Sequence, residues 1–379
     1  MDLQECRREI DGIDDQLISL FARRMELAGQ VAAVKAKSGK AILDPQRERE
    51  KLLDITEKCP EQFRDYAAAL YPLIFELSRG YQSRLLGKES RLVKDILSAV
   101  DSTPRIFPQR AKVACQGVEG AYSQIACQRL FRLPDISYFS SFDGVFSAIE
   151  QGLCRYGIIP LENSTAGSVN KVYDLMMKHS FKVVRSVRIK VDHDLLVKPG
   201  TKAEDIREIF SHQQALSQCA NYLQKFPGAR LVPCQNTALA AKMVAEGDGS
   251  TAALSSHICK DLYGLECLES SVQDMGNNYT RFICISRDLE IYPGADRSSL
   301  MLVLPHSPGA LYKVLSRFYA LGINLNKLES RPIPGRDFEF MFYFDLDTPV
   351  YSPSFIQLMG EMEDLCEQFQ YLGSYSEVI

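Results

Sequence analysis

Apolar positions in the first part of the chain recur every three or four residues, which is the period of an α-helix. The pattern predicts a first helix over about 3–37, a second that begins at Pro45, and a third over about 63–86. Pro72 would interrupt or bend the third helix. The first helix would be about 50 Å long, longer than a small domain is wide, so we expect its apolar stripe to pack on a second copy of the chain. Residues 1–95 are therefore predicted to form an all-α domain.

The pattern changes after residue 95, where prolines and polar residues break the helical period. Pro104 and Pro108 lie in this run, and we interpret 96–110 as a linker. From 111 to 287, short apolar runs alternate with helical periods, which predicts an α/β domain with a mostly parallel sheet. Polar side chains at the carboxyl ends of such strands usually form the functional site.

The last segment, 298–379, has the order strand, helix, strand, strand, helix, strand, which predicts a ferredoxin-like domain. The predicted strands are 299–304, 324–331, 338–347 and 370–375, and the predicted helices are 309–321 and 354–369. A fold of this kind indicates no function by itself.

Length and composition set broad limits on function. A chain of 379 residues is expected to form two to four domains, and 46% hydrophobic with 24% charged residues is typical of a soluble globular protein. The formal net charge of -4 gives no overall signal for nucleic acid or an anionic membrane. No apolar run approaches the roughly 20 residues that span a bilayer. The N-terminus lacks the apolar core of a signal peptide, so we expect a cytoplasmic protein.

Cysteine usage points the same way. The 11 cysteines include no CxxC pair, and most, such as Cys115, Cys154 and Cys284, lie in apolar runs. We interpret them as reduced core residues and not as a disulfide or zinc framework. No metal or redox cofactor is expected, because the sequence shows neither a ligand cluster nor a GxGxxG nucleotide loop.

Several charged and polar side chains lie among the helical positions of the first domain. A solvated face with charge pairs one turn apart is the commonest use of such residues. Alternatively, arginines that converge in a helical bundle need an anionic partner, because an unpaired buried charge is very costly. A dianionic small molecule would supply one. The candidates are Arg7, Arg24, Lys35, Asp44, Arg47, Glu48, Ser78 and Gln82.

In order and residue type, these positions resemble the active-site pattern of the all-α chorismate mutases that are fused to prephenate dehydratase. The resemblance implies an intertwined helical dimer. Chorismate, which carries two carboxylates, would be bound by Arg7 from one subunit and by Arg24 and Arg47 from the other.

The resemblance also assigns the remaining positions. Lys35 and Gln82 would donate hydrogen bonds to the ether oxygen whose bond breaks. Glu48 would bind the ring hydroxyl, and Asp44 and Ser78 would complete the pocket. These residue types suit a Claisen rearrangement, which needs a compactly folded substrate and stabilised negative charge but no nucleophile.

In the α/β domain, polar segments follow predicted strands. They are Gly117–Ser123, Glu162–Ser164, Ser211–Ala215 and Asn277–Phe282. In the first, a glycine turn before a helix offers backbone N–H groups to an anion. Singly, each has an ordinary explanation: Asn277–Asn278 could be a turn beside a solvated Arg281, and His212 a structural cap. Together, in this order, the segments resemble prephenate dehydratases, and Thr280–Arg281–Phe282 is the most specific part.

The implied fold has two α/β lobes, like a solute-binding protein, with roughly 111–190 in one lobe and 191–273 in the other. The segment 277–282 would return to the first lobe and line the cleft. Prephenate dehydratase expels carbon dioxide and hydroxide, and Thr280 would help the hydroxyl leave. A threonine hydroxyl is a poor acid, so it could orient or relay a proton instead, and Glu162 is the second candidate.

The other implied residues bind substrate. Arg281 would pair with a substrate carboxylate if it faces the cleft; its competing role is structural, tying the lobes together. Gln213 stands where many relatives have proline, which makes the geometry around His212 less certain. The remaining substrate-positioning residues are Asn163, Ser164, Ser211, His212 and Gln214.

Two segments of the last domain resemble the signature motifs of the ACT regulatory domain in this enzyme family. They are Pro308–Leu311 and Leu328–Pro332. The resemblance implies that L-phenylalanine binds between paired ACT domains and inhibits the enzyme. The implied effector residues are Gly309, Ala310, Leu311, Asn324 and Leu325, with Glu329, Ser330 and Arg331 supporting the site and its coupling. Tyr312 replaces a commoner valine, which could change affinity or effector choice.

Together the resemblances imply a bifunctional enzyme, a homodimer or larger homo-oligomer, that converts chorismate to prephenate and prephenate to phenylpyruvate. Neither reaction is a net oxidation, so no cofactor is needed. One alternative is a mutase fused to a prephenate dehydrogenase, which the missing GxGxxG argues against. Another is an ACT-containing amino-acid-binding sensor without turnover.

Overall fold

The structure is a computed structural model that describes residues 2–86, 90–336 and 339–379. By its internal contacts the chain divides into two compact units. The first consists of Met1–Asp95, Leu304–Ile323 and Tyr351–Phe369, and the second of Ile96–Val303, Asn324–Val350 and Gln370–Ile379.

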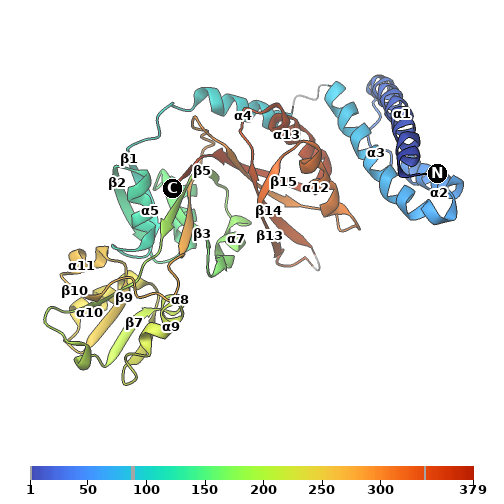
Figure 1. The fold of residues 1–379 in the computed structure, drawn as a ribbon. Coiled ribbons are helices and arrows are strands. Elements are labelled where there is room, and N and C mark those ends of the chain that lie inside the picture. The colour runs from blue at the N-terminus through green and yellow to red at the C-terminus, as the bar shows by residue number, and fades with distance from the viewer. Residues whose placement is uncertain (1, 87–89, 337–338) are drawn as a thin grey trace. The chain divides into compact units, whose positions relative to one another are not determined.

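The N-terminal part of the first unit is helical, as predicted. Its elements are α1 (Leu3–Ser38), α2 (Pro45–Lys58), the short 3-10 helix η1 (Glu61–Phe63) and α3 (Arg64–Leu85). Asp2 and Glu5 form a capping box at the start of α1. Both α1 and α2 pack against α3, and these blue helices lie side by side in Figure 1. Helix α3 continues through Pro72, so the predicted interruption is not observed.

Most apolar side chains of α1 face solvent in the single chain. Ala32 is the buried residue among those described in α1. In contrast, Leu17, Leu20 and Val34 are 57%, 63% and 66% exposed. The apolar stripe that the sequence predicts is therefore not covered within one chain, as expected for a helix that packs on a partner.

Two helices from the C-terminal segment also belong to the first unit. They are α12 (Ala310–Ala320) and α13 (Pro353–Leu365). Arg317 of α12 forms a buried ion pair with Glu361 of α13 at 2.9 Å and donates a hydrogen bond to the Glu76 carbonyl of α3 at 3.3 Å. Its guanidinium also lies over Gly80 of α3, where a Cβ atom would approach Arg317 Nη2 to 2.6 Å. Arg317 thus holds α12 against α3.

Helix α4 (Arg91–Ser102) corrects the predicted linker at 96–110. Its apolar residues keep the helical period beyond residue 95, and Ile96 and Ala99 are buried. The helix ends just before Pro104, which cannot continue it. The prolines mark only the end of α4, and the irregular part of the linker is confined to the stretch between Ser102 and Arg110.

The first lobe of the second unit is a seven-stranded mixed sheet in the order β16-β5-β11-β3-β1-β2, with β4 paired to β3. Its strands are β1 (Arg110–Gln116), β2 (Leu133–Phe139), β3 (Tyr156–Asn163), β4 (Gly167–Ser168), β5 (Lys182–Lys190), β11 (Tyr279–Ser286) and β16 (Glu377–Val378). Its helices are α5 (Tyr122–Leu130), α6 (Phe142–Glu150) and α7 (Asn170–Met176). Strands β1, β2 and β3 are parallel, whereas β11 runs antiparallel to both β3 and β5.

The second lobe is a five-stranded sheet in the order β10-β6-β9-β7-β8. Its strands are β6 (Asp194–Val197), β7 (Glu208–His212), β8 (Arg230–Cys234), β9 (Thr251–Ser255) and β10 (Glu266–Glu269). Its helical elements are η2 (Ala203–Asp205), α8 (Gln213–Gln218), α9 (Ala220–Leu223), α10 (Thr237–Glu246) and α11 (Ile258–Tyr263). The chain leaves the first lobe after β5 and returns in β11, so the two α/β lobes expected from the sequence are present (Figure 1).

The C-terminal sheet has the strand order of a ferredoxin-like fold, β13-β14-β12-β15. The strands are β12 (Arg297–Val303), β13 (Asn324–Pro332), β14 (Phe340–Asp347) and β15 (Gln368–Tyr375). The predicted strand start at residue 338 lies outside the described residues. The sequence pattern does not predict β16, which pairs in parallel with β5 and so joins the end of the chain to the first sheet.

Among the helices of the described residues, none is long and apolar enough to cross a membrane. The cysteines are free thiols, and Cys115, Cys154 and Cys284 are buried, as their apolar neighbours in sequence predict.

Candidate active sites

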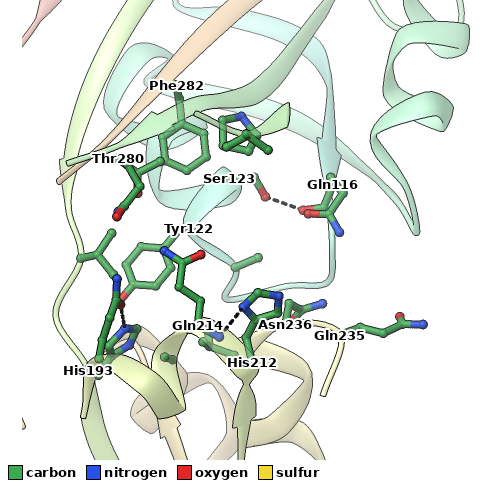
Figure 2. Close-up of a pocket in the computed structure, with 18 of the residues that line it drawn as sticks. Gln116, Tyr122, Ser123, His193, His212, Gln214, Gln235, Asn236, Thr280 and Phe282 are labelled. Atoms are coloured by element: carbon green, nitrogen blue, oxygen red, sulfur yellow. Dashed lines mark hydrogen bonds between the residues drawn. The ribbon is translucent and has the colours of Figure 1, made fainter. Parts of the chain in front are cut away.

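Residues of both lobes line a cavity of about 360 Å³, which Figure 2 shows in close-up. The apolar part of the wall includes Phe142, Pro160, Val169 and Phe282. The polar part consists of Gln116, Tyr122, Ser123, Asn163, His193, His212, Gln214, Gln218, Gln235, Asn236, Thr237 and Thr280. An apolar cavity with convergent polar groups is the usual form of a small-molecule site.

No lysine or arginine is among the described residues that line this cavity. The first turns of α5 and α10 reach the wall, since Tyr122, Ser123 and Thr237 begin these helices and line the cavity, and a helix N-terminus offers N–H groups and partial positive charge to an anion. The glycine turn before α5 is formed as predicted, with φ of 107° at Gly117 and 88° at Gly120. A Cβ atom at Gly120 would lie 2.8 Å from Cys259 Sγ, so glycine is needed there for space as well as for conformation.

The paired ends of β3 and β11 place the most specific motif at the cavity. Thr280 pairs with Asn163 across the two strands, and both line the cavity. Asn163 Nδ2 donates a hydrogen bond to Thr280 Oγ1 at 2.9 Å. Asn163 Oδ1 accepts hydrogen bonds from the backbone N–H groups of Thr165 (3.1 Å) and Ala166 (2.9 Å), which fixes the orientation of the amide.

Glu162 and Arg281 are not among the residues that line the cavity, which favours the structural role of the two that the sequence left open for Arg281. Successive side chains of a strand point to opposite faces, so these two residues lie on the face of the sheet opposite to Asn163 and Thr280. Arg281, which is buried, forms ion pairs with Glu162 (2.7 Å) and with Asp345 of β14. Burial lowers the pKa of Arg281, but Asp345 and other nearby groups outweigh it, so the net pKa is raised. Arg281 therefore joins the first sheet to the C-terminal sheet and does not face the cleft.

Ser211 and Ser164 also differ from expectation. Ser211 is fully buried and its hydroxyl donates to the Leu254 carbonyl at 2.7 Å, within the second sheet. Ser164 Oγ donates to the Asn277 carbonyl at 3.0 Å and accepts from the Tyr279 N–H at 2.9 Å. Neither serine is among the residues that line the cavity. Both positions hold strands in place, which a motif match alone cannot distinguish from substrate contact.

His212 and Gln214 do line the cavity, as expected. His212 caps α8, because its Nδ1 accepts a hydrogen bond from the Gln214 N–H at 3.3 Å. Burial lowers the pKa of His212. His193, Gln218 and Asn236 also line the cavity, although no sequence motif predicted them. Only the crossing from the first lobe to the second, next to β5, could have drawn attention to His193.

In the helical domain the structure brings several candidate residues together. Arg24 Nη1 donates a hydrogen bond to Ser78 Oγ, which connects α1 to α3. Lys35 Nζ donates to the Ile42 carbonyl at 2.5 Å, at the turn between α1 and α2. Gln82 is buried, and its Oε1 has no hydrogen-bond partner among the described residues. A buried, unpaired amide oxygen suggests a missing ligand or partner.

Of the other candidate residues in the helical domain, two contact neighbouring parts of the domain and two are exposed. Asp44 caps α2 by accepting a hydrogen bond from the Arg47 N–H at 3.0 Å. Glu48 forms an ion pair with Arg79 of α3, which the sequence analysis did not single out. The side chains of Arg7 and Arg47 are exposed, and no ion pair is found for either within the described residues.

Comparison with known proteins identifies both domains. Protein-family models match residues 6–83 to chorismate mutase type II and residues 113–290 to prephenate dehydratase. A bifunctional chorismate mutase/prephenate dehydratase from Aquifex aeolicus (strain VF5) is 30% identical over 381 residues, covering 100% of this chain and 99% of the relative. The chain belongs to the bifunctional chorismate mutase/prephenate dehydratase family.

Two further comparisons agree. The bifunctional chorismate mutase/prephenate dehydratase of Escherichia coli (strain K12) is 30% identical over 384 residues, covering 98% of this chain and 96% of the relative. The solved prephenate dehydratase from Arthrobacter aurescens, in complex with L-Phe, is 26% identical with a TM-score of 0.65, and covers 70% of this chain and 89% of that chain. The family prediction is confirmed, and this chain converts chorismate to prephenate and prephenate to phenylpyruvate.

The C-terminal segment of the chain contacts the first lobe through β13. Lys327 donates to Glu162 at 2.7 Å and to Ser168 at 2.9 Å, and Glu329 accepts from Ser168 at 2.5 Å. Arg331 forms two hydrogen bonds with Asp174 of α7, at 2.9 and 3.2 Å. The side chains of β13 alternate between partly buried and exposed positions, and the exposed set includes Asn324, Leu328 and Ser330.

Gly309, Ala310 and Leu311 lie at the start of α12 in the first unit. Gly309 is the residue before the helix and has φ of 81°, a left-handed conformation that favours glycine. Tyr312, in the first turn, is 58% exposed.

Proposed function

We propose that the dehydratase reaction takes place in the cavity between the lobes and that Thr280 assists departure of the ring hydroxyl. The observation that carries this proposal is the hydrogen bond from Asn163 Nδ2 to Thr280 Oγ1. Because the Thr280 oxygen accepts this bond, its O–H is left to donate to substrate. As carbon dioxide and hydroxide leave prephenate, a donor aimed at the departing oxygen stabilises charge that develops in the transition state. Such a hydroxyl can act by hydrogen bonding alone.

The two carboxylates of prephenate would be bound without a lysine or arginine of the described cavity wall. The N-terminal turns of α5 and α10 present backbone N–H groups and partial positive charge. Gln214 and His212, at the opposite wall, add hydrogen-bonding groups from the second lobe. Substrate bound in this way would contact both lobes.

For the mutase reaction, we infer a site built on Arg24, Lys35, Glu48 and Gln82. Arg24 would bind a chorismate carboxylate, and Lys35 and the Gln82 amide would donate to the ether oxygen. Glu48, now paired with Arg79, would exchange that contact for the ring hydroxyl of chorismate. The buried Gln82 supports a ligand or partner near this position, because its acceptor Oε1, at the other end of the amide from the donating N–H₂ group, has no hydrogen-bond partner among the described residues.

A homodimer would complete the mutase site. The uncovered apolar stripe of α1 supports pairing with the same helix of a second copy. Arg7 lies near one end of α1, remote in sequence from Lys35 at the other. An intertwined pair would bring Arg7 of one copy to the site of the other.

We further propose that the C-terminal segment is an ACT domain that binds L-phenylalanine and lowers dehydratase activity. The ferredoxin-like strand order and the L-Phe complex of the Arthrobacter relative support this proposal. Effector contacts would come from Gly309, Ala310, Leu311, Asn324 and Leu325. Glu329, Ser330 and Arg331 would support the site and its coupling.

The contacts of β13 suggest how an effector signal would reach the cavity. Lys327 binds Glu162 on one face of β3, and Asn163, the next residue, holds Thr280 on the other face. A shift of β13 would therefore act on the strand that orients Thr280.

Cytoplasmic location stays a prediction from the sequence.

The experiment that tests these proposals starts from chorismate alone. Purified protein is mixed with chorismate, and prephenate and phenylpyruvate are followed over time with and without L-phenylalanine. Phenylpyruvate that forms and is suppressed by L-phenylalanine supports both sites and the regulatory domain. Accumulation of prephenate alone would show that the cavity is not a working dehydratase site. Binding of L-phenylalanine without formation of prephenate or phenylpyruvate would favour the amino-acid sensor.

A further inference from the structure

His193 lines the cavity and carries a buried ring nitrogen without a hydrogen-bond partner among the described residues. His193 follows β5 at the crossing between the lobes, lines the cavity, and is 2% exposed. Its Nε2 lies 3.2 Å from Gln218 Oε1, the dashed contact at the lower left of Figure 2. Its Nδ1 is buried and has no hydrogen-bond partner among the described residues. A buried ring nitrogen without a partner is costly unless a ligand satisfies it.

The hydrogen-bond network determines whether Nδ1 is a donor or an acceptor. Asn163 Oδ1 accepts from two backbone N–H groups, so Asn163 Nδ2 must be the donor to Asn278 Oδ1 at 2.7 Å. The Asn278 amide then donates through Nδ2 to Gln218 Oε1 at 3.0 Å. Because Gln218 Oε1 is an acceptor, His193 must donate to it from Nε2. In the neutral ring, Nδ1 is therefore left as a bare acceptor.

We propose that His193 Nδ1 accepts a hydrogen bond from the ring hydroxyl of prephenate. This inference rests on the proposed location of the dehydratase site. At neutral pH prephenate carries two carboxylates, a ketone and a single hydroxyl, so the hydroxyl is its only hydrogen-bond donor. A bare acceptor on a residue that lines the cavity can therefore be satisfied by that one group of the substrate. Carboxylates, by contrast, would be repelled by the nitrogen lone pair.

His193 and Thr280 would then bind the same hydroxyl in complementary ways. Thr280 donates to the hydroxyl oxygen, and His193 accepts the hydroxyl proton. The two contacts fix the direction of the carbon–oxygen bond, whose electron pair leaves with the oxygen as the ring becomes aromatic. No proton needs to reach His193 in this step. His193 thereby selects a substrate that carries a hydroxyl.

The surroundings of His193 favour the neutral ring. Burial lowers the pKa of His193, and the charge of His212 lowers it further, whereas Gln218, Asp192 and Asp194 act in the opposite direction. The Tyr122 ring packs edge-on at 6.2 Å between ring centroids. A neutral ring is the state in which Nδ1 can accept.

Two substitutions separate this role from a structural one. His193→Gln can place an amide N–H near the position of Nε2 and keep the bond to Gln218, but it removes the Nδ1 acceptor. His193→Asn can place a carbonyl oxygen near the position of Nδ1 and keep the acceptor, but it loses the bond to Gln218. We expect the kcat/KM for prephenate to fall about tenfold or more in His193→Gln, the loss of one good hydrogen bond, and to recover partly in His193→Asn. The opposite order, or wild-type values in both, would overturn the proposal.

A substrate analogue tests the hydroxyl directly. The inhibition constant of the analogue with hydrogen in place of the ring hydroxyl should be the same in wild type and His193→Gln. If the analogue loses affinity in proportion to the loss in kcat/KM for prephenate, the effect does not pass through the hydroxyl and the proposal fails. Mutase activity of the same preparations reports on the folding of the rest of the chain. Full dehydratase turnover by Thr280→Val would instead refute the assignment of the cavity itself.

Discussion

Replacing Thr280 by valine removes one hydroxyl from the cavity wall and changes the side-chain shape little. The lost group is the proposed donor to the departing hydroxyl. Its removal should act on the chemical step, since a donor of this kind is worth most when charge develops in the transition state. Thr280→Ser keeps the hydroxyl and serves as the matched control.

The structure separates the catalytic cost from the cost in stability. Loss of a donor to a developing negative charge lowers kcat by about 100- to 1,000-fold, or about 3–4 kcal/mol. In stability the change is small, because Asn163 Nδ2 loses Thr280 but keeps Asn278 Oδ1 at 2.7 Å and has the Tyr279 carbonyl at 3.3 Å. The expected loss in the free energy of unfolding is about 1 kcal/mol or less.

The assay follows phenylpyruvate formed from added prephenate, with mutase turnover of chorismate measured on the same preparation. We expect the Thr280→Val protein to keep its mutase activity and its midpoint of urea unfolding, with the loss confined to dehydratase kcat. Thr280→Ser should keep most of the activity. A Thr280→Val protein within threefold of wild type would show that the hydroxyl takes no part in the reaction, and loss of both activities together would indicate misfolding.

Four other predictions follow from named contacts. Lys35→Ala should lower mutase turnover about 100-fold while dehydratase activity on added prephenate survives; equal loss of both would contradict separate sites. Arg281→Met leaves Asp345 buried without its cation and should lower the free energy of unfolding by about 3–5 kcal/mol, as measured by urea unfolding. Adding Asp345→Asn should restore part of this loss, and an unchanged unfolding midpoint in Arg281→Met would contradict the prediction. Arg331→Ala removes both bonds to Asp174 and should weaken inhibition by L-phenylalanine with turnover retained, whereas an unchanged inhibition curve would exclude β13 from coupling. The pKa of His193 is lower in the folded protein than in the unfolded chain, so below about pH 6.5 the unfolded state binds one more proton than the folded state. Acidification should therefore lower the urea midpoint of wild type more than that of His193→Gln. Asp192, Asp194, His212 and Tyr122 face this ring and are present in both proteins, so midpoints that fall in parallel would contradict the lowered pKa.

Much of the fold was predictable from the sequence because it follows from local periodicity. The helical period gives α1 to within a residue or two at each end, and Pro45 marks the start of α2. The element order of the C-terminal segment was likewise correct. Periodicity does not predict the pairing of strands that are far apart in the sequence. Strand β16 has two residues and is recognised as a strand through its pairing with the edge of β5. Helix α4 was not predicted, because Pro104 and Pro108 favoured a linker over 96–110 although an apolar repeat precedes them.

The candidate site was predictable as a set of segments and not as a set of contacts. Asn163 and Thr280 lie in the cavity as expected, but their sequence neighbours Glu162 and Arg281 lie on the other face. A motif preserves residue types without saying which side chains face a ligand, and Ser211 shows the same limit, since its hydroxyl is used inside the sheet. His193 and Gln218 line the cavity but belong to no motif, so the sequence did not predict them. Their importance comes from a hydrogen-bond network that spans segments far apart in the chain.

The alternation of side chains along β3 and β11 gives the most specific motif two uses at once. Thr280 and Arg281 are adjacent, so one faces the cavity and the other faces the C-terminal sheet. The same holds for Asn163 and Glu162, which pair with them across the strands. Any displacement of the C-terminal sheet that pulls on Arg281 or Glu162 must therefore also move the backbone that carries Thr280 and Asn163. A strand pair with a polar residue on each face is a short, stiff connection, and it needs no chain of intermediate residues to join a regulatory contact to a catalytic one.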